Sequence, residues 1–541
     1  MASSALKLFL LLSAVFLSRA SALNSSPSST TSLQSQLSSV RSLCKVTPYP
    51  DVCFDTLKLS ISVNISPNII IYLLHTLQTA LSESLKLSST FSNVRYSNII
   101  EKQKGTIQDC EELHQITLSA LKRSASRMQE ANHGKQAADA IRAYLSAALT
   151  NKNTCLEGLD SASGSFKPIL VNSINNAYKH VSNCLSILPR KWPQTGRKNR
   201  RLMAVPKWMS RENSRILESS DGEEYNPSLV LTVAADGTGN FTTITDAINF
   251  APNNSFDDRT IIYVKEGIYA ENVEIPSYKP NIVLLGDGSD VTFIVGSRSV
   301  DDGWTTFRSA TLAVSGDGFL ARDITIENRA GPQKHQAVAL RVNADLDALY
   351  RCSINGYQDT LYVHSFRQFY RECDISGTID FIFGNAAVVF QGCNIMARMP
   401  MPGQFTVVTA QSRDTLDENT GISIQNCSVV AADDLRSNSS RVKSYLGRPW
   451  RVYSRTVYLE SYIGDFIDHV GWTKWSDDQG LDTLYYGEYK NYGPGSSTDG
   501  RVTWPGYHVM DYSDAYNFTV SEFITSDAWL DSTSFPYNDG I

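Results

Sequence analysis

The first part of the chain carries hydrophobic residues at the spacing of an amphipathic α-helix. The positions are Ala138, Ile141, Leu145 and Ala148 in one stretch, and Leu170, Ile174, Ala177, Val181, Cys184 and Leu188 in another. Steps of three and four residues line one helix face and are typical of the seam of a bundle. Few glycines interrupt residues 33–188, so we predict an all-α four-helix bundle with a shorter helical lead-in. Cys184 lies on the seam and is expected to be a buried, unpaired thiol.

The second part alternates short β-rich runs with Gly, Asn and Asp turns. Runs of this kind are Thr260–Val264, Ile282–Leu285 and Ala310–Val314. An internal repeat adds more: Leu349–Ile354, Phe369–Ile375 and Val389–Ile395 resemble one another at intervals of 21 and 20 residues. A period near 20 with one such strand per repeat predicts an all-β body built as a parallel β-helix. Equivalent residues should then stack about 4.8 Å apart on neighbouring coils.

This period places two carboxylates side by side. Gln336, the pair Gln358 and Asp359, and Asp380 follow at intervals of 22 and 21 residues, on three successive coils. Two carboxylates that face one cleft cannot both ionise freely, so one should keep its proton near neutral pH. One aspartate can then attack while the other transfers protons, and the amide side chains can hold an oxyanion. Aromatic residues and glycines beside both aspartates suit a sugar-binding cleft.

Charge divides the chain in the same place as the two patterns. Of the 541 residues, 26 basic and 12 acidic residues precede Leu217, whereas 23 basic and 43 acidic residues follow it. The net charge of −6 is therefore the sum of a basic part and an acidic part. An acidic second body excludes nucleic acid as its partner, because binding phosphate requires a basic face.

The N-terminus and the cysteines indicate an exported protein. Residues 1–22 have the short apolar core and small-residue cleavage pattern of a secretory signal, and no later apolar run is long enough to cross a membrane. The nine cysteines are then expected to pair with one left over, and they offer no zinc motif. Glycosylation sequons begin at Asn24, Asn64, Asn240, Asn253, Asn426, Asn438 and Asn517.

A basic connector joins the two parts. Residues 189–225 contain prolines and a high density of Lys and Arg, which indicates an exposed tether. Arg200, Arg201, Leu202 and Met203 form a dibasic site in it that a secretory-pathway protease could cut. Arg215-Ile216-Leu217 is a poorer second candidate.

The helical part resembles the plant invertase and pectin methylesterase inhibitor domain. The resemblance covers residues 38–188. It rests on the eight-residue interval between Cys44 and Cys53, on Asp109-Cys110-Glu111-Glu112 and Thr154-Cys155-Leu156-Glu157-Gly158, and on Ser182-Asn183. It implies disulfides from Cys44 to Cys53 and from Cys110 to Cys155. This part holds no catalytic constellation, so we expect it to bind rather than react.

The second part resembles the pectin methylesterase family. The motifs are Gly356–Tyr362, Gly377–Gly384 and Leu446-Gly447-Arg448-Pro449-Trp450, and the resemblance covers residues 226–541. It implies a right-handed parallel β-helix. It also implies Asp380 as nucleophile, Asp359 as general acid/base, Gln336 and Gln358 as oxyanion donors, and Arg448 as the group that orients Asp380.

The implied reaction is hydrolysis of the C6 methyl esters of homogalacturonan, with release of methanol and with no cofactor or metal. Candidates for stacking on sugar rings are Tyr362, Phe383, Trp450 and Trp475, with core packing as a rival role for each. We expect a secreted, monomeric enzyme of the plant cell wall, with no nucleic acid or membrane partner. Separate inhibitor proteins are possible partners.

The remaining cysteines lie in the repeat. Cys352 and Cys373 occupy equivalent positions on adjacent coils, within the usual Cα separation of a disulfide. Cys393 would then pair with Cys427. A Cys373–Cys393 bridge has equally good spacing and would leave Cys352 unpaired.

Three alternative functions stay open at this point. A polygalacturonase or pectate lyase would share a β-helix with an acidic cleft, but neither requires amide oxyanion donors. A serine esterase lacks support because no G-x-S-x-G occurs. A non-catalytic chain would use its helical part to inhibit another enzyme.

We expect four segments: a signal at 1–22, an inhibitor-like prodomain at 23–188, a linker at 189–225 and the esterase at 226–541. We expect the prodomain to cover the Asp359/Asp380 cleft until the linker is cut. A folding aid or a retention signal is an alternative role for the prodomain.

Overall fold

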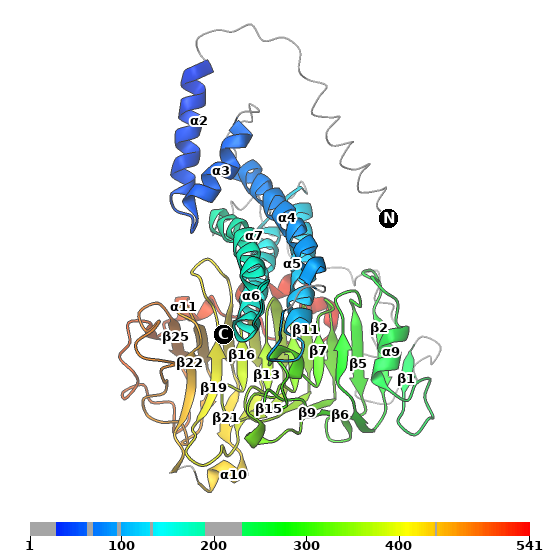
Figure 1. Ribbon diagram of the computed structural model, residues 1–541. Coiled ribbons are helices and arrows are strands. Elements are labelled where there is room, and N and C mark those ends of the chain that lie inside the picture. Colours follow the sequence, from blue (N-terminus) through cyan, green and yellow to red (C-terminus); the bar gives the residue numbers. More distant parts are fainter. Residues whose placement is uncertain (1–28, 62–68, 95–98, 130–133, 190–229, 439–440) are drawn as a thin grey trace.

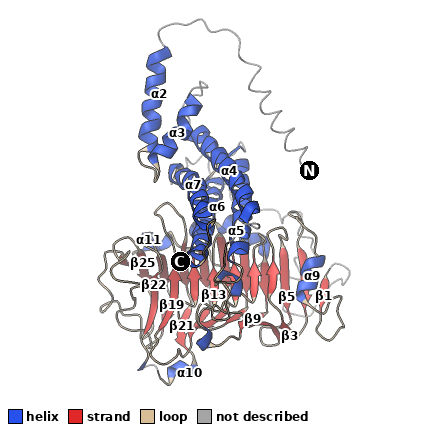
Figure 2. Cartoon of the chain, viewed as in Figure 1, coloured by secondary structure: helices blue, strands red, loops and turns tan. Residues whose placement is uncertain are grey.

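A helical bundle stands on one side of a long body of parallel strands (Figure 1). The computed structural model describes residues 29–61, 69–94, 99–129, 134–189, 230–438 and 441–541. Figure 2 shows the helices gathered above the strands, with only short helices attached to the strand body. The predicted order of an all-α part followed by an all-β part is confirmed. Among the described residues, no helix combines the length and apolarity that crossing a bilayer requires.

The bundle consists of four long helices and two that precede them. The helices are α2 (Ser29–Cys44), α3 (Pro50–Ile61), α4 (Ile69–Val94), α5 (Thr106–Gln129), α6 (Lys135–Ser161) and α7 (Lys167–Ile187). Helices α2 and α3 lie at the end of the bundle away from the strands, whereas α5 and α6 reach the strands (Figure 1). The predicted apolar seams are buried in both α6 and α7, which confirms the four-helix bundle with its helical lead-in.

The strand body is a right-handed parallel β-helix with three sheets. The first contains β1 (Leu231–Val233), β2 (Thr260–Val264), β5 (Ile282–Gly286), β8 (Leu320–Arg322), β11 (Asp347–Tyr350), β14 (Arg367–Arg371), β17 (Ala387–Gln391), β20 (Gly421–Gln425), β23 (Arg455–Leu459), β25 (Tyr485–Tyr489) and β26 (Tyr507–Val509). The second, called the cleft sheet below, contains β4 (Val273–Ile275), β7 (Leu312–Val314), β10 (Leu340–Val342), β13 (Leu361–Val363), β16 (Ile382–Gly384), β19 (Thr406–Gln411) and β22 (Ser444–Pro449). The third contains β3 (Gly267–Ala270), β6 (Thr292–Gly296), β9 (Thr325–Asn328), β12 (Ser353–Asn355), β15 (Asp374–Gly377), β18 (Asn394–Ala397), β21 (Ser428–Ala431) and β24 (Tyr462–Ile463).

Short helices cover the ends and edges of this body. They are α9 (Ile244–Phe250), α10 (Asp433–Arg436), α11 (Tyr512–Tyr516) and α12 (Val520–Phe523), with 3-10 turns at Phe307–Ser309, Pro332–Lys334, Ser526–Ala528 and Leu530–Thr533. Residues near the C-terminus, such as Phe518, Phe523 and Trp529, pack with Phe369 and Val389 of the first sheet in a second core outside the coil.

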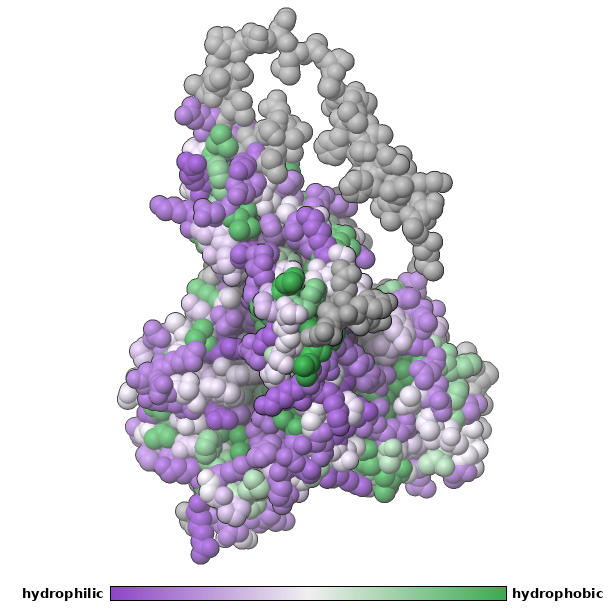
Figure 3. Space-filling model, in the orientation of Figure 1, coloured by the Kyte–Doolittle hydropathy of each residue, from purple (hydrophilic) through white to green (hydrophobic). Residues whose placement is uncertain are grey.

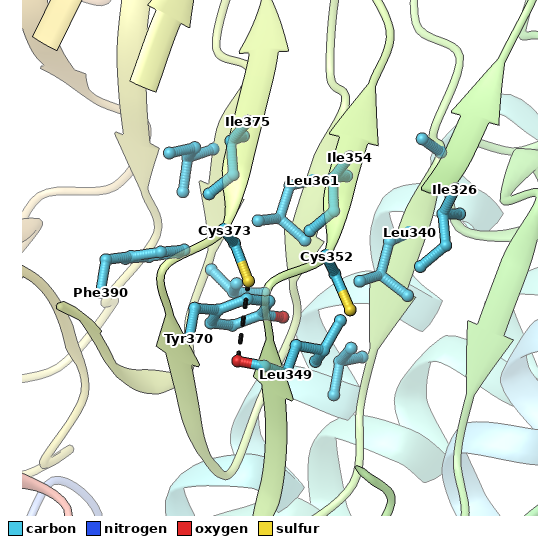
Figure 4. Close-up of a cluster of buried hydrophobic side chains, with 14 of the residues drawn as sticks. Ile326, Leu340, Leu349, Cys352, Ile354, Leu361, Tyr370, Cys373, Ile375 and Phe390 are labelled. Carbon is cyan, nitrogen blue, oxygen red and sulfur yellow. Dashed lines mark hydrogen bonds between the residues drawn. The ribbon is translucent and has the colours of Figure 1, made fainter. Parts of the chain in front are cut away.

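The core inside the coil is a set of hydrophobic ladders. Ile354 pairs in register with Ile375, which pairs with Ile395, as the 20-residue repeat predicted. Figure 4 shows Ile354 and Ile375 on adjacent strands, in the same cluster of side chains as the aromatic ring of Tyr370. Each of the three isoleucines is fully buried. The repeat therefore reflects burial, because every coil must place an apolar side chain at the same inward position.

The cysteines confirm one part of the predicted pairing and correct another. Cys44–Cys53 and Cys110–Cys155 are disulfides with Cα separations of 5.5 and 4.7 Å. Cys184 is buried and free, as predicted. The predicted Cys352–Cys373 and Cys393–Cys427 bridges are wrong, and so is the Cys373–Cys393 alternative, because all four of these cysteines are free and buried.

The reason lies in how the thiols are oriented. The four cysteines occupy one register position on successive coils, but each thiol points to a backbone carbonyl. The Cys373 thiol donates to the oxygen of Leu349 at 3.6 Å, and the Cys393 thiol donates to the oxygen of Tyr370 at 3.5 Å (Figure 4 shows the first of these). Even spacing along the ladder gives no pair of cysteines preference over the next.

This arrangement predicts a thiol count. Alkylation of the denatured, unreduced protein should label Cys184, Cys352, Cys373, Cys393 and Cys427 and leave the four bundle cysteines of the two disulfides unlabelled, as read by peptide mass spectrometry. Labelling of Cys184 alone would show that the β-helix cysteines pair after all.

Candidate functional site

The two predicted aspartates lie at equivalent positions of adjacent coils. Asp359 comes two residues before Leu361 in β13, and Asp380 comes two residues before Ile382 in β16. Leu361 pairs in register with Ile382, and the Asp359 N–H donates to the carbonyl of Ile379 at 3.0 Å. The period of the sequence thus brings the two carboxylates together as predicted.

Both aspartates have an uncommon backbone conformation. Their φ angles are 61° at Asp359 and 50° at Asp380, in the left-handed region that costs free energy for most residues but that Asp tolerates. Gly377 makes room for the turn before Asp380, because a Cβ there would lie 2.2 Å from the Cβ of Phe381. Strained residues of this kind are common at functional sites, where they aim a side chain.

Arg448 holds the carboxylate of Asp380 on both oxygens. It lies in β22, and its Nε and terminal nitrogen donate to Oδ1 and Oδ2 of Asp380 at 2.8 and 2.6 Å. A bidentate guanidinium fixes the plane of a carboxylate as well as its charge. Asp380 is therefore oriented by Arg448, as the sequence predicted.

The two carboxyl groups differ in their pKa values. Burial, followed by repulsion from Asp380, raises the pKa of Asp359 well above its ordinary value, although Arg448 opposes this. Burial also raises the pKa of Asp380, against the hydrogen bonds and charge of Arg448. An opposite charge such as that of Arg448 alone would lower the pKa of Asp380, but burial outweighs Arg448 in this arrangement. The proton still favours Asp359, because Arg448 binds Asp380 directly.

Gln336 and Gln358 share one cavity with the aspartates. The cavity has a volume of about 300 Å³ and is also lined by Arg448, Trp450 and Trp475. Both glutamines are half-buried, and the N–H of Ala337 ties them together by donating to the carbonyl of Gln358 at 3.2 Å. All five residues predicted to be catalytic thus line one space. Within the described residues, no cluster of His, Cys, Asp and Glu side chains is suited to hold a metal ion.

The four predicted aromatic residues fall into two pairs. Tyr362 and Phe383 stack with ring centroids 4.2 Å apart and are buried. Trp450 and Trp475 stack at 6.2 Å, and Trp475 keeps 38% of its surface exposed. Arg448 lies 4.3 Å from the ring centroid of Trp475. Aromatic faces beside the carboxylates suit the apolar faces of sugar rings.

Helix α6 of the bundle covers this cavity. Thr154, Glu157 and Gly158 line it, and Glu157 forms an ion pair with Arg451 just beyond β22. The Thr154 hydroxyl lies 2.9 Å from Nε2 of His364. As a result, Asp359 and Asp380 retain only 9% and 4% of their surface.

Helix α5 covers the neighbouring part of the cleft sheet. Its Asp109 and Glu112 both pair with Arg308, at 2.7 Å each. Glu112 also lies 3.5 Å from Arg341 of β10. Further along the helix, Arg123 pairs with Asp317, and at the start of α6 Lys135 pairs with Glu522 at 2.5 Å. Ion pairs therefore join the two bodies at several points over the cleft sheet and, through Glu522 of α12, beyond it.

The sequence did not identify the residues of this interface. Arg341, Tyr362 and Phe383 recur at intervals of 21 residues, so the period that located the aspartates could also have located Arg341. Asp109, Glu112 and Glu157 occur in the motifs of the inhibitor resemblance, but nothing in one sequence tells which surface they contact.

Of the predicted glycosylation and processing sites, some lie within the described residues and others do not. Asn240, Asn253, Asn426 and Asn517 are exposed and Asn438 is half-buried, which is compatible with glycosylation at the surface. The signal segment, Asn24, Asn64 and the dibasic site Arg200, Arg201, Leu202 and Met203 lie outside the described residues. In the view of Figure 3, hydrophilic residues predominate over both bodies and hydrophobic ones form small separate patches.

Comparisons with known proteins agree with this arrangement. A family model described as pectinesterase matches residues 230–527, and one described as plant invertase/pectin methylesterase inhibitor matches residues 38–187. The chain is 67% identical to probable pectinesterase/pectinesterase inhibitor 12 of Arabidopsis thaliana, covering 94% of this chain and 95% of that protein. It is 45% identical to pectinesterase/pectinesterase inhibitor PPE8B of Prunus persica, covering 84% of each chain. The solved structure of pectin methylesterase from carrot is similar with a TM-score of 0.58 and 51% identity, covering 59% of this chain and all of the carrot chain.

The ion pairs of α5 and α6 predict that docking of the two bodies depends on pH. Burial raises the pKa of Asp109 to about 6, against the charge of Arg308 and the hydrogen bond from Thr305, while neighbouring Glu112 raises it further. Undocked, Asp109 should return to about 3.9, so docking takes up a proton between these values. The contribution is complete below about pH 4 and is lost as the pH rises through about 6. Burial raises the pKa of Glu157 in the same direction. For Glu112, burial raises the pKa but is outweighed by Arg341 and Arg308, which lower it. Its contribution to docking is therefore present at neutral pH and is lost as the pH falls below its ordinary pKa range.

We expect the bodies to separate more readily as the pH rises from about 4 to about 6, with affinity falling roughly tenfold for each unit by which a pKa is raised. The measurement is the dissociation constant between the bundle and the strand body, determined by analytical ultracentrifugation after the linker of the full chain has been cut. Asp109→Asn should flatten this dependence. An unchanged slope in that variant would refute the assignment to Asp109.

Proposed function

The chain belongs to the pectinesterase family and carries a domain of the plant invertase/pectin methylesterase inhibitor family, and we propose that Asp380 and Asp359 perform its reaction as nucleophile and general acid/base. The reaction itself is the hydrolysis of pectin methyl esters. Family membership decides for the esterase against the glycosidase, the lyase, the serine esterase and the non-catalytic alternatives. One observation carries the assignment of roles: Arg448 donates two hydrogen bonds to the carboxylate of Asp380 and not to that of Asp359.

In the first step an oxygen of the Asp380 carboxylate attacks the C6 carbonyl carbon of a methyl galacturonate unit. The carbonyl electrons move to oxygen, and the amide groups of Gln336 and Gln358 donate hydrogen bonds to that oxyanion. When the oxyanion collapses, the bond to the methoxy oxygen breaks, and Asp359 gives its proton to the departing methanol. The sugar is left bonded to Asp380 as an acyl-enzyme.

In the second step the roles of Asp359 reverse. Its carboxylate now takes a proton from a water molecule, whose oxygen attacks the acyl carbonyl carbon. The bond to the Asp380 oxygen breaks, which restores Asp380 as an anion and frees a galacturonic acid group. That acid passes its remaining proton to solvent and becomes the galacturonate carboxylate. Asp359 is again protonated, so the cycle closes without a metal or cofactor.

The pKa directions support this division of labour. A general acid must hold its proton at the working pH, and burial with repulsion from Asp380 raises the pKa of Asp359 well above its usual range. A nucleophile must be ionised, and Arg448 opposes the effect of burial at Asp380. Removal of the bundle would re-expose both groups to water and so lower both pKa values.

The proposal extends to the helical part, which we assign as a prodomain that inhibits the enzyme in the same chain. Its α6 lines the cavity with Thr154 and Glu157 directly above the aspartates. A pectin chain could not enter while these side chains fill the cleft. Cleavage at Arg200-Arg201-Leu202-Met203, or at the poorer site near Arg215, would then release the activity.

The aromatic pairs are assigned to substrate binding on the same basis. Trp450 and Trp475 retain exposed surface beside Arg448 and are suited to stack on a sugar ring. Tyr362 and Phe383 pack with the bundle in one hydrophobic cluster, so their faces would become available only when the bundle leaves. We place the mature enzyme outside the cell in the plant cell wall, as a monomer that meets a processing protease and separate inhibitor proteins.

The assignment of Asp380 predicts a specific loss. Asp380→Asn should lower methanol release from methylated pectin by roughly 10³-fold or more, because the amide is not a nucleophile. Asp374→Asn is the matched control, since Asp374 lies on the same coil in the third sheet, where its side chain accepts a bond from Asn394. Near-normal methanol release by Asp380→Asn would disprove the mechanism. The pectin chain length should stay unchanged after treatment with either variant.

A further inference from the structure

A single row of side chains runs across the cleft sheet. Register pairs Arg341 with Tyr362, Tyr362 with Phe383, Phe383 with Ala410, and Ala410 with Arg448. The last four of these residues line the cavity that holds the aspartates. Arg341 is the next member of the row and faces the same helix-covered side, because it contacts Glu112 of α5. It lies two strands, about 10 Å, from the strand that follows Asp380.

Beside Arg341 lies a second arginine with the same partners. Arg308 pairs with Asp109 and Glu112 at 2.7 Å, and its remaining carboxylate contact is Glu274 at 3.4 Å. Arg341 contacts Glu112 and donates within its own body to Asn343. Two of the three carboxylates that contact these guanidinium groups thus come from the bundle.

The surroundings of both arginines donate hydrogen bonds. The hydroxyl of Thr305 donates to Asp109, and the hydroxyl of Ser315 donates to Glu112 at 2.9 Å. The Arg341 guanidinium lies 3.5 Å from the ring centroid of Phe307, which holds it flat against the wall of the cleft. When the bundle leaves, this preformed group of two guanidiniums and two hydroxyls loses Asp109 and Glu112, and the carboxylate contact that remains is that of Glu274 with Arg308 at 3.4 Å. Such a group is suited to bind carboxylates again, since planar guanidinium groups match their geometry.

The position of Arg308 and Arg341 in the cleft indicates which carboxylates they would bind once the bundle has left. A substrate that extends from Asp380 along this row would pass over Arg341 and reach Arg308. Fully methylated units are neutral there, whereas units that have already lost methanol carry the charge that these groups recognise. We propose that Arg308, Arg341, Thr305 and Ser315 form a subsite for free galacturonate carboxylates, and that Asp109 and Glu112 occupy it in the uncut chain by imitating two such carboxylates. This inference rests on the proposed function, because it takes the polymer to lie across Asp380.

Spacing and net charge support the imitation. Asp109 and Glu112 are three residues apart on α5, so their side chains project from the same face as neighbours. The esterase part, residues 226–541, carries 39 acidic against 23 basic residues, so it repels a polyanion except where arginines concentrate. The subsite would therefore direct the enzyme to methyl esters that lie beside units already demethylated, and it would retain the acidic product.

The test compares an acidic ligand with a neutral substrate on the separated esterase part, residues 230–541. This part has cores of its own, and it is prepared by cutting the linker of the folded full chain and removing the bundle, so the test does not require it to fold alone. The probes are an unesterified oligogalacturonate as inhibitor and fully methylated pectin as substrate. The quantity is the ratio of the inhibition constant of the former to the KM of the latter.

We expect Arg308→Gln and Arg341→Gln each to raise this ratio about tenfold or more, because each removes charge-assisted hydrogen bonds to the carboxylate only. Arg329→Gln is the matched control, since Arg329 is a surface residue paired with Glu327. An unchanged ratio in both cleft variants would overturn the subsite.

A second measurement does not depend on the folding of these variants. In the full chain after a linker cut, the oligogalacturonate should compete with the bundle and shift its dissociation constant, and Glu112→Gln should make displacement easier. Displacement by methylated and unmethylated oligomers alike would also overturn the inference. Failure of the proposed function would look different, since it is read from Asp380→Asn on methylated pectin without any acidic ligand.

Discussion

Coils of the β-helix stack in parallel register about 4.8 Å apart, and the site depends on this stacking. It places Asp359 beside Asp380 through the pairing of Leu361 with Ile382. The same register carries Arg448 to the nucleophile from a strand 68 residues further along the chain and aligns Arg341 with the aromatic pair. Because inward positions are filled by fully buried apolar ladders, a shift of one coil would break the core as well as the site. Rigid stacking of this kind holds catalytic groups in position without help from a ligand.

Burial by the bundle acts on the same groups in two ways. In the function we propose, it blocks the path of the polymer, and it removes water from carboxyl groups whose charge catalysis requires. The raised pKa values of Asp359, Asp380 and Asp109 share burial as their largest cause. In the mechanism we propose, the bundle thus opposes ionisation of Asp380, while its own carboxylates pair with Arg308 and Arg341. Blockage of the cleft and disfavoured ionisation of Asp380 arise from one interface.

Much of this could be predicted from the sequence because it is periodic. Spacing of three and four residues located the bundle seams, and an interval near 21 located the coils and both aspartates. The cysteine ladder shows where periodicity misleads. The interval put Cys352 beside Cys373 correctly, but whether two neighbouring thiols bond or turn to carbonyls depends on side-chain orientation, which spacing does not contain. Arg341 follows the same period as Tyr362 and Phe383, yet its partner Glu112 lies more than 200 residues earlier in another body. Contacts between bodies depend on surface shape and charge in three dimensions, so one sequence alone does not reveal them.

The central claim is that α5 and α6 close the cleft in the intact chain. The most direct measurement is methanol release from methylated pectin by a full-length chain whose linker carries a single engineered protease site in place of the natural dibasic one, assayed before and after that site is cut and the bundle removed. If α5 and α6 close the cleft, we expect little methanol release before the cut and a large rise afterwards. Equal release by the intact and the cut chain would contradict it.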